Sequence, residues 1–248
     1  MEIHANDLHK APGQGWKHYF FEFFMLFTAV FCGFLAENWR EHIVELEREQ
    51  QYIRSFYQDL TEDENDQQKT INNLDHEVII ADSLFALLNN INTTKPANQV
   101  YMDLRSMSRS GTVLVRVNDR TIVQLRNAGG MRLIRNKNVS DSMMVYYKEI
   151  SYLQFLFDES VSIRRSLREK YEPLLDAADF AKIVDNNNAI INPANVLHLR
   201  SADPNTINSC LLEINNIRGL SIGTKKRIQA LKERAKRIKQ FIEKEYQI

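Results

Sequence analysis

Residues 19–36 read YFFEFFMLFTAVFCGFLA, and the chain continues directly into the charged sequence ENWRE at residues 37–41. The apolar stretch holds seven of the chain's thirteen phenylalanines and one charged residue, Glu22. Its 18 residues are near the lower limit for an α-helix that crosses a bilayer. The join therefore predicts a membrane-spanning helix over residues 19–37 that runs on as a water-exposed stalk helix over residues 38–91.

Two other interpretations of the apolar stretch fit part of the pattern. A secretory signal peptide has a basic start and small residues before its cleavage site. This chain has Glu2 and Asp7 in its tail of residues 1–18, and Phe34 stands where a small residue is needed. A buried core helix is the other alternative, because only residues 23–36 are free of charge. We favour a single membrane span.

Aromatic and basic residues at the ends of a span anchor it at the membrane surface. The anchors expected here are Trp16, Tyr19, Trp39 and Arg40. Basic residues flank both ends of the span, so their number does not decide its orientation.

Glu22 suggests a functional face on the span, because an ionisable group at membrane depth is costly. Steps of three and four residues place five side chains on one face: Glu22, Leu26, Ala29, Gly33 and Glu37. Ala29 and Gly33 form a small-x-x-x-small pair, which lets two helices approach closely. This face predicts self-association of the span. The alternative is that Glu22 reaches the headgroups from its place one turn after Lys17, and the nearness of Glu22 to the end of the stretch favours it.

A heptad-like apolar seam follows the span and is typical of a coiled coil. Its members are Trp39, Ile43, Leu46, Ile53, Tyr57, Leu60, Ile71, Leu74, Val78, Ala81, Phe85 and Leu88. The seam predicts one helix, or two nearly collinear helices, from about Trp16 to Asn90, on the order of 110 Å long. Residues 61–70 (TEDENDQQKT) are polar on all sides, so we expect them to protrude into solvent or to mark a break.

The rest of the chain predicts further helices and an all-α fold, in which glycine and proline are scarce. We expect helices at 96–108, 119–127, from a cap at Asn138 or Ser140 to about 170, at 173–183 and at 204–218, with Gly129 near a helix end. Residues 92–222 would form a small helical domain, and a turn at 219–223 would lead into a basic helix at 223–248. That helix has nine bases and two acids over residues 225–244, which complement ten acids and three bases over residues 37–66. It is expected to pack antiparallel on residues 39–60.

Neither composition nor motifs indicate an enzyme. The 32 basic and 32 acidic residues balance, the two cysteines form no disulfide framework, and the six histidines lack the spacing of a metal site. No phosphate-binding or nucleophile motif occurs, so no catalytic residue, cofactor or metal is expected. A basic cluster suggests a surface for an anionic partner, although too few aromatic residues accompany it for nucleic acid. Its members are Arg116, Arg120, Arg126, Arg132, Arg135 and Lys137.

Two segments carry a resemblance to a known family. They are AENWRE at residues 36–41, after the apolar span, and TIVQLRNAGGMRLIRNK at residues 121–137, with VYY at 145–147. Together they resemble a family of uncharacterised single-span inner-membrane proteins of Bacteroidota, over about residues 20–60 and 120–147. The span here is richer in phenylalanine, and Gly129-Gly130 replaces a single glycine. The resemblance implies an inner-membrane anchor with the N-terminal tail inside and a helical domain in the periplasm, and it brings no known activity.

Three functional hypotheses follow. The first is a non-enzymatic, membrane-anchored helical scaffold that associates with itself in the lipid bilayer and presents a surface to an unidentified protein partner. The second is an oligomeric ion or proton conduit, or a proton-coupled sensor, in which Glu22 lines the assembled span. The third is an enzyme with an unrecognised site in the soluble domain.

Overall fold

The computed structural model describes residues 16–109, 118–127 and 129–248. Their helices are α1 (Trp16–Leu88), α2 (Asn98–Arg109), α3 (Arg120–Asn127), η2 (Gly130–Leu133), α4 (Lys137–Tyr171), η3 (Glu172–Leu174), α5 (Ala177–Lys182) and α6 (Pro204–Tyr246). Within the described ranges, extended backbone pairs at one isolated bridge, Val184 with Ile190. The predicted all-α fold is confirmed. Contacts divide the chain into Met1–Gln51 and Tyr52–Ile248, which we describe separately.

The long first helix is confirmed as one element of 73 residues. The expectation for residues 61–70 is wrong, because α1 neither breaks there nor exposes the whole segment. Asp63, Gln67 and Thr70 are 1%, 1% and 4% exposed. These polar side chains are buried because hydrogen-bond partners meet them inside the fold, which a scan for apolar residues does not detect.

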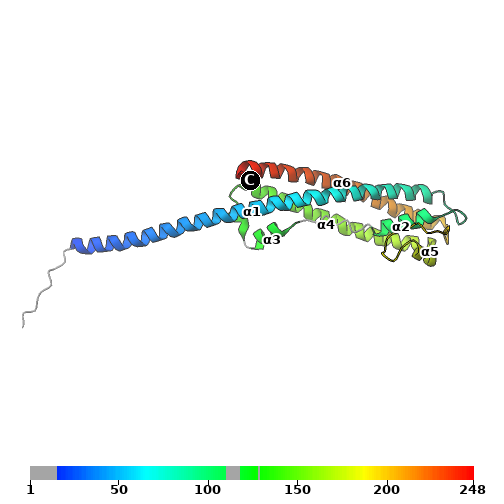
Figure 1. The fold of residues 1–248 in the computed structure, drawn as a ribbon, viewed down its shortest axis with the longest axis horizontal. Coiled ribbons are helices and arrows are strands. Elements are labelled where there is room, and N and C mark those ends of the chain that lie inside the picture. Colours follow the sequence, from blue (N-terminus) through cyan, green and yellow to red (C-terminus); the bar gives the residue numbers. More distant parts are fainter. Residues whose placement is uncertain (1–15, 110–117, 128) are drawn as a thin grey trace, which may run out of the picture. The chain divides into compact units, whose positions relative to one another are not determined.

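Residues 52–248 form an up-down-up-down four-helix bundle in which α1, α4 and α6 run alongside one another (Figure 1). Side-chain contacts between α1 and α6 give their directions. These are Tyr57–Glu243, Glu64–Lys239, Gln68–Lys232, Asp75–Lys225 and Asp82–Arg218. From the first contact to the last, the residue number rises by 25 on α1 and falls by 25 on α6, so the predicted antiparallel packing is confirmed. These contacts run from Tyr57 to Asp82, so they meet the expected stretch of residues 39–60 only at its end and continue well beyond it.

The second arm of the bundle is built from two short helices. Asp103 on α2 accepts a hydrogen bond from Ser83 near the end of α1, whereas Arg120 at the start of α3 pairs with Asp59. The chain from α2 to α3 therefore runs back along α1. The sequence GTVLVRV at residues 111–117 predicts an extended segment or a loop, and it lies outside the described residues.

Two hydrophobic cores lie one after the other along the bundle. One includes Leu84, Tyr101, Leu104, Leu167 and Ile214. The other includes Phe56, Leu60, Tyr146, Ile228 and Ile238. Both cores lie entirely within residues 52–248, so this part of the chain has the buried apolar surface that independent folding needs.

The predicted turn at 219–223 is wrong, because α6 is one helix of 43 residues. Gly219 and Gly223 lie inside it, and a Cβ at either position would contact nothing within 4 Å. Glycine weakens a helix by only about 1 kcal/mol relative to alanine. Burial of Ile217 and Ile228 on either side outweighs that cost. The cap of α4 is Asn136, not Asn138 or Ser140.

Candidate functional site

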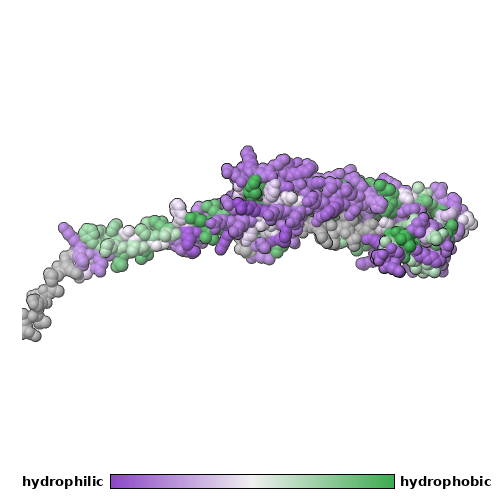
Figure 2. Space-filling model, viewed as in Figure 1, coloured by the Kyte–Doolittle hydropathy of each residue, from purple (hydrophilic) through white to green (hydrophobic). Residues whose placement is uncertain are grey.

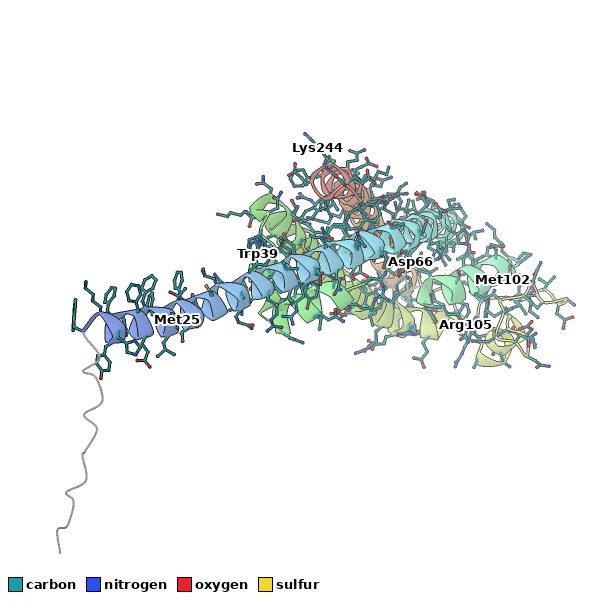
Figure 3. All side chains as sticks on the ribbon, turned by 60° about the vertical axis from the view of Figure 1, so that its left-hand side comes forward. Met25, Trp39, Asp66, Met102, Arg105 and Lys244 are labelled. Atoms are coloured by element: carbon teal, nitrogen blue, oxygen red, sulfur yellow. The ribbon has the colours of Figure 1, made fainter. Side chains whose placement is uncertain are left out.

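The start of α1 is an apolar helical segment whose side chains are exposed. Every residue from 16 to 36 is exposed, including Phe27 at 54% and Val30 at 75%. Figure 2 shows hydrophobic colours along this part of the chain, and Figure 3 shows the side chains near Met25 standing away from the helix. In the part of the chain that the structure describes, α1 alone is long and apolar enough to cross a membrane. None of its apolar window is buried, whereas the core helix of a soluble protein is mostly buried.

This exposed segment has two different faces. Phenylalanine rings stack one turn apart on one face, with centroids 6.3 Å apart for Phe23–Phe27 and 6.0 Å apart for Phe27–Phe31. Ala29 is two residues from Phe27 and two from Phe31, a rotation of about 200° around a helix. The predicted small-residue face therefore lies opposite the phenylalanine face. At Gly33 an added Cβ would meet nothing within 4 Å.

The residues predicted at the ends of the span are also exposed. Trp16, Tyr19 and Trp39 are 81%, 59% and 73% exposed. Arg40 forms an ion pair with Glu37 one turn earlier. That pairing gives Glu37 a local partner.

The predicted basic cluster is divided by the fold. Arg120 Nη2 lies 3.1 Å from Asp59 and 3.3 Å from Glu62, so this cation is already paired on α1. Arg126, Arg132 and Lys137 are exposed. Arg135 is also exposed and makes an interaction of its own. Arg116 lies outside the described residues.

A buried polar cluster joins α1 to the start of α3. Asp59 and Asp63 are one helical turn apart and 2% and 1% exposed. Asp59 Oδ2 accepts hydrogen bonds from the backbone N–H and the hydroxyl of Thr121, at 3.3 and 2.5 Å. Asp63 Oδ1 accepts the backbone N–H of Asn118 at 2.9 Å. The two aspartates thus bind backbone N–H groups in and just before the first turn of α3, where the helix dipole favours negative charge.

The same cluster continues onto α4. Tyr146 Oη donates to Asp63 Oδ2 at 2.9 Å and accepts from Gln67 Nε2 at 3.0 Å. Burial, opposed in part by these hydrogen bonds, raises the pKa of Asp63 to about 6. Burial and the neighbouring Asp63 also raise the pKa of Tyr146, so its hydroxyl stays protonated as a donor. Gln67 Oε1 is buried and has no hydrogen-bond partner among the described residues.

A second polar cluster contains the buried ion pair of Glu77 and Arg164. Their exposed fractions are 2% and 3%. Glu77 Oε1 bonds Arg164 Nη2, and Glu77 Oε2 accepts from Ser221 on α6 at 2.5 Å. Arg164 also donates to the carbonyl of Met107 at the end of α2 and to Ser160. One cluster thereby links all four arms of the bundle.

We compared the chain with known protein families, curated proteins and solved structures. No protein family matches this chain, and no curated protein or solved structure is significantly similar to it. The family resemblance of residues 36–41 and 121–137 therefore stays a prediction.

Sequence reasoning missed the residues of both polar clusters. Asp59 and Asp63 belong to an acidic run that reads as a solvated helix face, and Arg164 lies in a charged stretch of α4. One signal was available: the apolar seam of α1 has polar members at Glu64 and Gln67, between Leu60 and Ile71. Within the described residues, Asp59, Asp63, Glu77 and Arg164 each bond another segment of the chain. Their role is therefore structural.

Proposed function

We propose that this protein is a membrane-anchored helical scaffold, with residues 19–37 in a bilayer and residues 52–248 as a water-exposed interaction domain. The observation that carries the proposal is that the two parts of α1 differ in exposure. The first part of α1 is apolar and uncovered, whereas later residues of the same helix, such as Phe56 and Leu84, are fully buried in the bundle. Lipid is the solvent that matches an uncovered apolar helix of this length.

The proposal includes self-association of the span. The phenylalanine face would contact lipid chains, while the opposite face with Ala29 and Gly33 lets a second copy approach closely. A bacterial inner membrane with the bundle in the periplasm is the localisation that the family resemblance implies. The scaffold has no catalytic activity in this proposal, and its protein partner is unidentified.

Membrane integration is tested with the full chain carrying Phe27→Arg and Phe31→Arg. Each arginine at the centre of a span costs about 3 kcal/mol on insertion scales. We expect wild-type protein to stay with membranes through an alkaline carbonate wash and the double variant to be released. Phe155→Arg, at an exposed position on α4, is the control and should behave as wild type. Wild-type protein that is freely soluble without detergent would disprove the anchor.

Self-association is tested separately by Gly33→Leu, with Phe31→Leu on the opposite face as the matched control. Mass measurement of detergent-solubilised protein should show fewer subunits for Gly33→Leu and no change for Phe31→Leu. A wild-type monomer would overturn this part of the proposal and leave the anchor intact.

Glu22→Leu separates the scaffold from the conduit hypothesis. A scaffold assembles as before or more strongly without this carboxyl, because an apolar residue is cheaper in lipid. A conduit or proton-coupled sensor would instead show proton flux in proteoliposomes that the substitution abolishes.

A further inference from the structure

The end of the bundle where α4 meets α5 contains a cavity of about 330 Å³. It is lined by Arg168, Tyr171, Glu172, Leu175, Ala177, Phe180 and Arg200. Its volume is at the lower end of the range for small-molecule sites, and its lining combines aromatic and aliphatic side chains with a few charges. We propose that this cavity binds a small carboxylate ligand that has a flat apolar body.

The charge of the cavity favours an anion. Arg168 and Arg200 are exposed and make no side-chain hydrogen bond or ion pair within the described ranges. By contrast, Arg109 bonds Asn188 and Arg218 pairs with Asp82. Guanidinium groups match the planar geometry of a carboxylate. Two unpaired arginines at one cavity therefore supply the complementary charge.

The apolar part of the lining suits a flat ligand body. Phe180 lies 6.0 Å from Tyr171 and 6.3 Å from Tyr101 between ring centroids. The guanidinium of Arg105 lies 4.9 Å from the centre of the Phe180 ring, which adds positive charge close to the cavity. Leu175 provides an aliphatic surface beside these rings.

Among the residues that line the cavity, Glu172 is the one carboxylate that would oppose an anion. Asp179 pairs with Lys182 at 2.7 Å, and Asp176 accepts the backbone N–H groups of Ala178 and Asp179. Glu172 lines the cavity, and its side chain makes no ion pair with any residue that the structure describes. Removing the charge of Glu172 should therefore strengthen binding.

The walls of the cavity are fixed before any ligand arrives. Tyr101, which is fully buried, accepts the backbone N–H of Asp176 at 2.8 Å and donates to the carbonyl of His198 at 3.0 Å. The backbone N–H of Arg200 donates to the carbonyl of Leu174 at 2.9 Å. These bonds hold η3, α5 and the segment before α6 together, and such preorganisation reduces the entropy lost on binding.

The test is calorimetric titration of the full chain in lipid nanodiscs with 3-phenylpropionate, after subtraction of the titration of empty nanodiscs. The neutral 3-phenylpropionamide has the same body without the charge. We expect the acid to bind at least about tenfold more tightly than the amide. We also expect added salt to weaken binding of the acid.

Variants locate the binding. The double variant Arg168→Ala, Arg200→Ala should bind the acid at least about tenfold more weakly, and Glu172→Gln should bind it more tightly. Arg165→Ala removes an exposed arginine on the same helix outside the cavity and should leave binding unchanged. No binding of the acid up to roughly 10 mM, equal affinity for acid and amide, or wild-type binding by the double variant would overturn the proposal.

Discussion

Replacing Arg164 with methionine tests whether the central polar cluster holds the bundle together. The substitution removes the partner of Glu77 and two further donors, to the carbonyl of Met107 and to Ser160. Glu77 would keep its bond from Ser221 but lose its cationic partner at 2% exposure. A buried charge without its partner is the costly outcome, more so than the loss of the pair itself.

The expected loss in the free energy of unfolding is about 3–5 kcal/mol, the range for breaking one side of a buried ion pair. For a folded unit of this size the midpoint temperature should fall by roughly 10 °C. The double variant Glu77→Leu, Arg164→Met removes both charges. Its loss should be smaller, about 1–3 kcal/mol, because the carbonyl of Met107 is then the main group left without a partner.

Urea unfolding followed by circular dichroism measures these losses on residues 41–248, which contain both hydrophobic cores. The two single variants and the double variant form a thermodynamic cycle, and the coupling between Glu77 and Arg164 should exceed about 1 kcal/mol. Additive losses, or an Arg164→Met variant within about 1 kcal/mol of wild type, would refute the reasoning.

Further predictions concern single residues. Gly219→Ala and Gly223→Ala should each raise the free energy of unfolding by about 0.5–1 kcal/mol, because both lie inside α6 and an added Cβ meets no atom. Gly129→Ala should lower it by about 1–2 kcal/mol, since Gly129 has a φ of +61°; equal signs for the α6 and Gly129 variants would contradict this. Burial raises the pKa of Asp63 to about 6, so the folded state binds the proton more tightly. Protonated Asp63 therefore adds to the free energy of unfolding below about pH 4. This contribution, roughly 3 kcal/mol, is lost as the pH rises through 6. Urea titrations at both pH values should show this loss in wild type and not in Asp63→Asn. Burial raises the pKa of the Cys210 thiol to about 12, so Ellman's reagent should modify it only after unfolding, and rapid labelling of the native bundle would argue against its burial.

Much of the fold was predictable because it depends on local signals. The apolar segment at residues 19–36, the bounds of α1 and a glycine near a helix end at 129 follow from hydrophobicity, periodicity and backbone sterics, which neighbouring residues express. The break expected at Gly219–Gly223 shows the limit of that approach. The local preference of glycine favours a turn. In this fold the buried side chains on both sides of the two glycines stabilise a continuous helix instead.

The sequence by itself determined that the chain is a series of helices led by one long apolar segment, because each of these properties resides within a few consecutive turns. Only the tertiary structure decided which polar residues are buried and which cations are free. Asp63 bonds Tyr146, which lies 83 residues further along the chain, and Glu77 bonds Arg164, which lies 87 residues further. A charged residue on a helix reads the same in sequence whether it faces water or a partner, so its role depends on which distant segment packs against it.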